Sequence, residues 1–325
     1  MNLKLAAPLV SLLAALCLPL GLAHAQTYPS KPIRLIVPFA PGGNVDITAR
    51  TVAPELSTLL GQQVIVENKP GAGGTIGAND VAKSPPDGYV LLVGSNSTVS
   101  VAPALYPKNP YNPVKDFMPI SNLAEVPFVL VVNPAVPART VSELVAITKQ
   151  NPARYSMASA GTGSSNHLVG ELFQSSTGAK LTHIPYKGSG QALVDLVGGQ
   201  VDTMFDQLTS ASANIKAGKL RALAVSSSAR WPGLNDVPTF GEAGVRNFEI
   251  TNVTGLLAPA GTPPEVIAKL HAAIVKAMAT PAVRERFATL GVAPVGNQPE
   301  QFATFIREDF ARWTKVVKDG NIKVE

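Results

Sequence analysis

Strand-like and helix-like segments alternate along this chain, and the alternation constrains the fold more than any other feature. Apolar runs of strand length, such as residues 33–37 and 89–93, are separated by stretches with helical periodicity, such as residues 45–60. Strand–helix–strand order is typical of parallel sheets with helices packed on their faces. The chain is therefore predicted to be α/β, and in such sheets ligands bind outside the carboxyl ends of the strands.

The alternation is interrupted twice, which predicts two lobes. An apolar run over residues 128–132 has no helix after it, a second α/β series then starts, and a further crossing is expected near residues 250–257. We expect a discontinuous first lobe, residues 26–125 plus 250–325, and a second lobe, residues 126–249. Each lobe would be a mostly parallel sheet flanked by helices, with a ligand cleft between the lobes.

The first 25 residues have the pattern of a secretory signal. Lys4 supplies a positive charge, residues 5–22 are apolar, and Ala23-His24-Ala25 is a small-residue cleavage site. A transmembrane anchor is the alternative, but the cleavage site and the polar residues after it favour cleavage near Ala25. Cys17 is the only cysteine and lies inside this segment, so disulfides and thiolate metal sites are excluded from the exported protein.

Charged residues are dispersed along the chain. The formal net charge is +5, and no run is rich in lysine and arginine. This distribution argues against a nucleic-acid partner. After the signal segment, no further apolar run is long enough to span a membrane. We therefore expect a soluble protein, and we expect it to be a monomer.

A Pro-Gly-Gly turn after the first strand is a candidate anion site. The segment Val37–Asp46 combines a strand end, a turn with Gly42 and Gly43, and a helix start. Glycine permits positive φ and a close approach of the backbone to a ligand. The first N–H groups of a helix have no intrahelical partner and favour an anion. Both carboxylate and phosphate would suit such a turn.

A similar turn is predicted in the second lobe. A strand leads to a turn with Gly161, and Ser164 and Ser165 then open a helix that carries His167. Serine at a helix start is first of all a cap, so capping and ligand binding both remain open for each residue. Two such helix starts, one in each lobe, could face each other across the cleft and hold the two ends of one small anion.

Further polar groups follow other predicted strands. Ser95 and Thr98 could donate to a carboxylate, or could belong to an ordinary polar loop. Tyr186 could cover a ligand with its ring and offer its hydroxyl group. Asp206 could accept a hydrogen bond from a ligand hydroxyl or ammonium group, or could cap the following helix.

Motifs for catalysis and for cofactors are absent from the sequence. It contains no G-x-S-x-G elbow and, after the signal segment, no cysteine nucleophile. The segment Gly71–Gly77 resembles a dinucleotide loop, but its third glycine comes one residue late, so we interpret it as a turn into a helix. The histidines after the signal segment are scattered, without metal-ligand spacing. We therefore expect neither a cofactor nor a metal site.

Ordered motifs along nearly the whole exported chain resemble the solute receptors of the tripartite tricarboxylate transporters, also called the Bug family. The number and order of these motifs make the resemblance specific. The matching segments are residues 28–34, 37–46, 66–74, 86–89, 161–167, 185–188, 199–202 and 257–263.

The resemblance implies a periplasmic receptor with the type II binding-protein fold, which closes around a small carboxylate and docks on a membrane permease. In the family, the loop that matches Phe39–Asp46 grips one carboxylate, largely through backbone groups and ordered water. The loop that matches Gly161–His167 supplies contacts from the other lobe. Asn44 and Asn166 stand where relatives often have other small residues or proline.

Pattern and resemblance together define thirteen candidate ligand-binding residues. Carried over from the family, the first grip is Gly42, Gly43 and Asp46, and the second is Ser164, Ser165 and His167. The full set is Phe39, Pro41, Gly42, Gly43, Asp46, Ser95, Thr98, Gly161, Ser164, Ser165, His167, Tyr186 and Asp206.

Two alternatives to transport stay open. One is a ligand sensor that docks on a signalling partner instead of a permease, and the other is a secreted enzyme on the same scaffold, which would need a nucleophile–base pair. The sequence does not choose the ligand, because backbone donors can bind dicarboxylates, tricarboxylates, aromatic acids and acidic amino acids alike.

Overall fold

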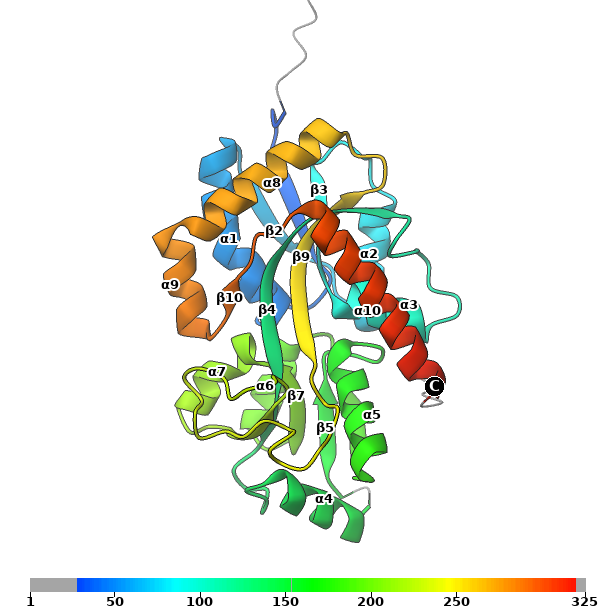
Figure 1. Ribbon diagram of the computed structural model, residues 1–325, viewed down its shortest axis with the longest axis vertical. Coiled ribbons are helices and arrows are strands. Elements are labelled where there is room, and N and C mark those ends of the chain that lie inside the picture. The colour runs from blue at the N-terminus through cyan, green and yellow to red at the C-terminus, as the bar shows by residue number, and fades with distance from the viewer. Residues whose placement is uncertain (1–27, 153, 320–325) are drawn as a thin grey trace, which may run out of the picture.

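The computed structural model describes residues 28–152 and 154–319, and these form one curled ten-stranded sheet with helices packed against it (Figure 1). The predicted signal segment and its cleavage site lie outside the described residues. The sheet has the strand order β2-β1-β3-β9-β4-β7-β5-β6, and β8 and β10 pair with β4. It divides into two lobes, which Figure 1 shows one above the other.

The first lobe follows the predicted alternation closely. Strand β1 (Ile33–Val37) pairs in parallel with β2 (Val64–Asn68) and β3 (Val90–Ser95). Helices α1 (Asn44–Leu60) and α2 (Thr75–Ala82) make the connections between them. β1 is almost entirely buried, which explains why its sequence is a continuous apolar run and not an alternation of apolar and polar residues.

The second lobe repeats this arrangement. Strand β5 (Ser156–Ser159) pairs in parallel with β6 (Thr182–Pro185) and β7 (Thr203–Gln207). Its other elements have the order expected from the sequence. They are α4 (Val141–Gln150), α5 (Ser165–Thr177), α6 (Ser189–Val197), α7 (Leu208–Lys216) and β8 (Arg221–Val225).

The long strand β4 (Phe117–Val132) runs from the first lobe into the second, and β9 (Thr251–Pro259) lies beside its first part (Figure 1). β4 pairs with β9 as far as Pro127 and with β7 and β8 from Phe128 onward, and all of these pairs are antiparallel. Each lobe is therefore a mixed sheet, because the crossing strands add antiparallel pairs to its parallel strands. Lobe boundaries near residues 125 and 250 remain our proposal.

The C-terminal segment returns along the first lobe and reaches the second. Its elements are α8 (Pro264–Ala279), α9 (Pro281–Leu290), β10 (Ala293–Pro294) and α10 (Pro299–Asp319). Each of the three helices begins with a proline. Proline has no N–H group, but an N–H group at the first position of a helix has no intrahelical partner, so no hydrogen bond is lost. On α10, Trp313 is buried in the same apolar cluster as Phe128 and Phe173, so this helix packs against both lobes.

One helical segment was not predicted. The polar stretch after β3 continues as a π-helical turn, Ser97–Val101, and the short helix α3 (Ala102–Leu105). The Thr98 side chain holds the start of this turn, since its hydroxyl group accepts from the Ser95 N–H and donates to the Ser95 carbonyl, both at 3.1 Å.

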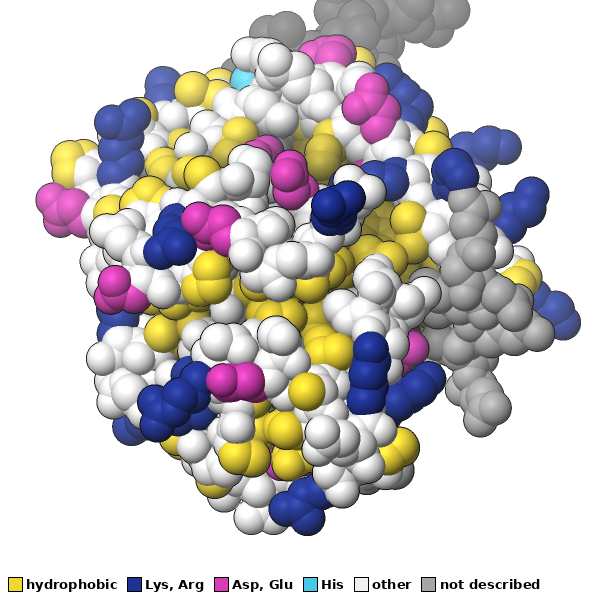
Figure 2. All heavy atoms as spheres, turned by 60° about the horizontal axis from the view of Figure 1, so that its bottom comes forward, with side chains coloured by type: hydrophobic (Ala, Val, Ile, Leu, Met, Phe, Trp, Pro, Cys, Tyr) yellow, Lys and Arg dark blue, Asp and Glu magenta, His cyan; other side chains and the backbone are white. Residues whose placement is uncertain are grey.

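Surface charge is mixed on the face shown in Figure 2, where lysine and arginine side chains are scattered among carboxylates. Within the described part of the chain, no single helix is both long and apolar enough to cross a membrane. The pair α8 and α9 meets the length and hydropathy criteria only when taken together, and it is bent by 68° at its junction.

The contact between β9 and α10 generates a first prediction. A Cβ added at Gly255 would lie 2.5 Å from the Phe302 ring and 2.7 Å from the Ser121 carbonyl oxygen, which the sheet holds in place. Overpacking of this kind costs about 1–3 kcal/mol, so Gly255→Ala should lower the urea midpoint of unfolding. Gly241→Ala is the control, because its Cβ would meet only Thr239 Oγ1, at 3.7 Å. Equal midpoints for the two variants would contradict this account.

Candidate functional site

A narrow cavity of about 20 Å³ lies between the lobes, at the carboxyl ends of β1, β3, β5 and β7. None of its lining side chains is ionisable. They are Phe39, Gly43, Asn44, Val45, Ser95, Ser97, Ala160, Asn166, Ser189 and Gln207. Among the residues that the structure describes, no group of three or more His, Cys, Asp or Glu side chains could hold a metal ion.

Four helices begin at this cavity: α1 from the first lobe, and α5, α6 and α7 from the second. The residues that precede α1 and α6 are Gly43 and Gly188, which have no side chain to cap the helix, and Gln207 before α7 makes no capping hydrogen bond. Helix N-termini carry partial positive charge and present N–H groups without intrahelical partners. The cavity can therefore bind an anion without any cationic side chain.

The start of α5 is tied to its surroundings by its serines. Ser164 caps the helix by accepting from the His167 N–H at 3.3 Å, so the capping interpretation is correct for this residue. The Ser165 N–H donates to Ser97 Oγ at 2.9 Å, and the two hydroxyl groups lie 3.0 Å apart. This second contact joins the lobes, because Ser97 follows β3 and Ser165 begins α5.

The two lobes touch beside the cavity, so the structure is the closed form. The Ala40 N–H donates to the Lys187 carbonyl at 3.0 Å. A Cβ added at Gly190 would lie only 2.2 Å from the Pro41 carbonyl oxygen. The turn that contains Pro41 and Gly42 thus packs directly against the start of α6, and glycine at 190 allows this close approach of two backbones.

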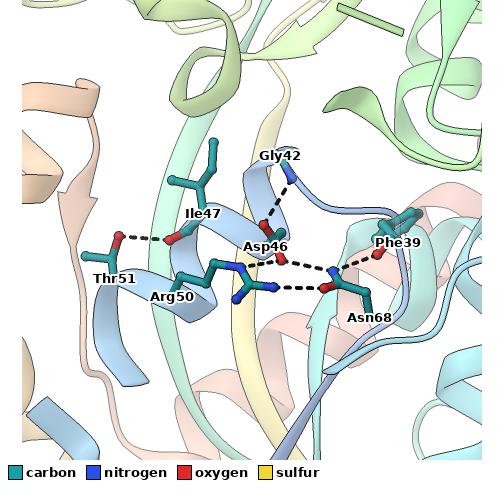
Figure 3. Close-up of polar contacts among 7 residues, drawn as sticks. All are labelled: Phe39, Gly42, Asp46, Ile47, Arg50, Thr51 and Asn68. Atoms are coloured by element: carbon teal, nitrogen blue, oxygen red, sulfur yellow. Dashed lines mark hydrogen bonds and ion pairs between the residues drawn. The ribbon is translucent and has the colours of Figure 1, made fainter. Parts of the chain in front are cut away.

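Asp46 lies behind the first turn and does not line the cavity. Its carboxylate accepts from the Gly42 N–H at 3.0 Å, from Arg50 Nε at 3.0 Å and from Asn68 Nδ2 at 2.9 Å (Figure 3). Asn68 Nδ2 also donates to the Phe39 carbonyl at 2.9 Å. Of the predicted first grip, Gly43 therefore reaches the cavity, whereas Gly42 and Asp46 form the support that shapes the turn.

Asp206 also lies behind the cavity wall and is fully buried. It accepts from Ser210 Oγ at 2.6 Å and from Asn166 Nδ2 at 3.2 Å, and Asn166 Nδ2 donates to the Phe205 carbonyl at 2.7 Å. Burial raises the pKa of Asp206 to about 6, although these hydrogen bonds favour its ionised form. Asp206 thereby fixes the orientation of Asn166, which does line the cavity.

His167 supports the second turn as one half of a stacked histidine pair. Its ring stacks on that of His183 at 3.8 Å, and its Nδ1 accepts from the Gly163 N–H at 3.3 Å. His183 Nε2 lies 2.7 Å from Ser159 Oγ, which accepts from the Gly161 N–H at 3.1 Å. Burial lowers the pKa of His167 to about 3 and that of His183 to about 4, so both rings are neutral near pH 7.

The remaining candidates are near the site without lining it. The Tyr186 hydroxyl group donates to Asp195 at 2.7 Å, so it is held within its own lobe. A Cβ added at Gly161 would lie 3.0 Å from the Tyr186 carbonyl oxygen, at a φ of +124° that favours glycine. Of the thirteen predicted residues, three line the cavity: Phe39, Gly43 and Ser95.

Seven lining residues were not among the candidates, although each lies in or next to a turn that the sequence singled out. Their positions in the sequence could have identified them as lining residues, because all of them flank a strand end or a helix start. They are Asn44, Val45, Ser97, Ala160, Asn166, Ser189 and Gln207.

The histidine pair generates a prediction about pH. The folded-state pKa of His183 is below the ordinary value of 6.5, so its contribution to stability is present above pH 6.5 and is lost as the pH falls toward 4. A fully titrating group changes stability by about 1.4 kcal/mol per pH unit. His183→Gln should therefore flatten the decline in urea stability between pH 7 and pH 5.

The comparison with the unmodified protein isolates this histidine. Asp206 acts in the opposite sense, because its raised pKa makes stability fall as the pH rises from about 3.8 to about 6. That effect is present in both proteins and cancels in their difference. Identical pH profiles for the two proteins would show that His183 is not held neutral by the fold.

Comparisons with known proteins agree with this architecture. The family model for the tripartite tricarboxylate transporter family receptor, TctC, matches residues 48–322. BugT of Bordetella pertussis is 42% identical over 302 residues, which is 93% of each chain. A solved periplasmic transporter has a TM-score of 0.90 at 48% identity, with 92% of this chain and 100% of that chain covered.

A second solved relative carries a ligand. MatC of Rhodopseudomonas palustris, solved with bound malate, has a TM-score of 0.87 at 38% identity, covering 89% of this chain and all of its own. These matches confirm the resemblance and the two-lobe fold that the sequence predicted, and they identify a family of solute-binding receptors, not of enzymes. The chain belongs to the tripartite tricarboxylate transporter receptor family.

Proposed function

We propose that this protein is a periplasmic receptor that captures a small organic carboxylate by lobe closure and delivers it to a tripartite tricarboxylate-type permease. The observation that carries the proposal is the convergence of four helix N-termini on one cavity without an ionisable lining side chain. Such a cavity suits a ligand whose charge is met by backbone N–H groups. A related receptor solved with malate supports this ligand class.

The cavity is nearly closed in this structure. Its volume of about 20 Å³ has room for about one water molecule. The contacts between Ala40 and Lys187 and between Ser97 and Ser165 leave the lobes touching beside it. An organic acid therefore enters only when the lobes move apart.

Closure follows from the distribution of the helix starts between the lobes. The start of α1 belongs to the first lobe, and the starts of α5, α6 and α7 belong to the second. A ligand that binds one lobe gains contacts with the other only when the lobes approach, so binding shifts the population toward the closed form. No histidine or lysine lines the cavity, and the wall residue Ser189 hydrogen-bonds to Asp206 behind the wall.

A thermal-shift screen of the exported protein across organic acids and neutral sugars tests the ligand class. At one hundred times its Kd, a ligand adds about 2.7 kcal/mol of stability. We expect at least one small carboxylate to raise the unfolding temperature and the sugars to leave it unchanged. Stabilisation by a sugar and by no acid would reject a carboxylate ligand.

An uptake assay tests delivery to a permease. Deletion of the gene that encodes this protein should abolish uptake of the acid that stabilises it. Normal uptake in the deletion strain would reject delivery to a permease.

The close approach at Gly190 provides a test of closure. Even a methyl group at this position would collide with the Pro41 carbonyl oxygen, so Gly190→Ala should hold the lobes apart and weaken ligand binding at least tenfold. Gly198→Ala is the matched control at the other end of α6, where the nearest atom to the new Cβ would be the Val194 carbonyl oxygen at 3.4 Å. Titration calorimetry measures both affinities, and unchanged binding by Gly190→Ala would argue against closure at this contact.

A further inference from the structure

A groove of about 550 Å³ lies where the chain passes between the lobes, and it shares no lining residue with the cavity described above. Its walls come from both lobes. The second lobe supplies residues 226–228, which follow β8, and the first lobe supplies Ala293 of β10 together with Phe305 and Asp309 of α10. A change in the angle between the lobes must therefore change the width of this groove.

The groove and the cavity lie on opposite faces of the ladder between β4 and β9. Side chains alternate between the two faces of a strand, and residues paired across a ladder point to the same face. Glu125 of β4 pairs with Val253 of β9, and both line the groove. Thr254, the next residue of β9, pairs with the cavity residue Ser95, and its hydroxyl oxygen accepts from the cavity residue Asn44 at 2.9 Å. The ladder therefore separates the two spaces.

Both passages of the chain between the lobes lie at one level, which locates the hinge. The ladder between β4 and β9 ends at the pair Pro127 and Thr251, and from Phe128 onward β4 pairs with β7 and β8. Just beyond this level, the Ser226 hydroxyl group accepts from the Phe128 N–H at 2.8 Å and donates to the Ile250 carbonyl. We therefore expect lobe motion to bend the chain between residues 127 and 128 and between residues 250 and 251.

The first-lobe wall of the groove is fixed to the strand that it faces. Asp309 is 5% exposed and accepts from Asn96 Nδ2 at 2.8 Å, and Arg312 forms an ion pair with it at 2.8 Å. Asn96 Oδ1 in turn accepts from the Val253 N–H at 2.6 Å. This part of α10 is therefore held to β9 and moves with it when the lobes move.

A hinge with the cavity on one face and the groove on the other couples the two spaces, because rotation that opens the cavity brings the walls of the groove together. Resting on the closure proposed above, we propose that the residues of this groove set the balance between the open and closed forms, and with it the ligand affinity, without touching the ligand. A side chain that fills the groove fits the closed form and obstructs the open form. The apparent affinity then rises with the fraction of protein that is closed.

Bulky substitutions in the groove test the inference. Ser228 in the second lobe and Ala293 in the first lobe are exposed groove residues. We expect Ser228→Trp and Ala293→Trp each to raise the ligand affinity about tenfold, mainly through slower dissociation, because overpacking of the narrowed groove opposes opening. The controls are Ser175→Trp and Ala272→Trp, which change exposed residues of the same two lobes outside the groove and the cavity.

These sites avoid the place where the lobes already meet at the groove. Trp231 also lines the groove, but its Nε1 donates to the Gly291 carbonyl at 2.7 Å, so a substitution there would remove an existing contact between the lobes as well as change the space. Two variants, one in each lobe, also keep the test decisive if one of them fails to fold.

Two measurements on the exported protein decide the outcome. Titration calorimetry uses whichever of succinate, citrate, benzoate and glutamate binds the unmodified protein most tightly. Small-angle scattering compares radii of gyration, and the ligand-free groove variants should be more compact than their controls, with the difference lost at saturating acid. Affinities and ligand-free radii equal to those of the controls would overturn the inference, as would weaker binding by both groove variants.

Failure of this inference is distinguishable from failure of the proposed function. If an acid binds the unmodified protein and the groove variants behave like their controls, the inference fails and the proposed function stands. If no organic acid binds, the proposed function itself fails, and the ligand-free radii still decide whether the groove controls the balance between the two forms.

Discussion

Backbone N–H groups at four helix starts must be held in a fixed arrangement inside one cavity, and much of the surrounding structure serves this requirement. Asp46 accepts from Gly42 and so sets the turn before α1. Ser164 caps α5, and Asp206 orients Asn166 at the wall. These side chains act on the backbone and on one another, and the side chains that line the cavity are all neutral. Donors positioned in advance bind a ligand with little further loss of conformational freedom.

The sequence was sufficient to predict the fold, because the relevant information is periodic and local. The predicted strand over residues 33–37 is β1 without any shift, and the predicted helix over residues 45–60 is α1 to within one residue. The two interruptions of the alternation correspond to the crossing strands β4 and β9. The turn around Ser97–Val101 could not be predicted in this way, since its conformation depends on hydrogen bonds from Thr98 and on burial by the rest of the molecule.

The candidate site was predicted as a set of turns, and a cavity lies at these turns, but the direction of individual side chains was not accessible from the pattern. A carboxylate near a glycine turn can face the ligand or the backbone, and Asp46 faces the backbone because Arg50 and Asn68 lie one helical turn and one strand away. His167 faces His183 for a similar reason: the parallel pairing of β5 with β6 brings His183 beside the second turn. Two of these partners, Asn68 and His183, are distant in sequence, so spacing within one segment does not report them.

A site built from helix starts has consequences for how charge is recognised. The ligand's charge would be met inside a closed cavity, where dissolved ions screen interactions much less than at the surface. On the face shown in Figure 2 the lysines and arginines are scattered, and they can influence the approach of an anion without lining the cavity. Ionic strength should then act mainly on the association rate, whereas the dissociation rate depends on the N–H groups and on the contacts that keep the lobes together. Neutral His167 and His183 fit this division, because their rings position the second turn without adding a charge whose effect would vary with pH around neutrality.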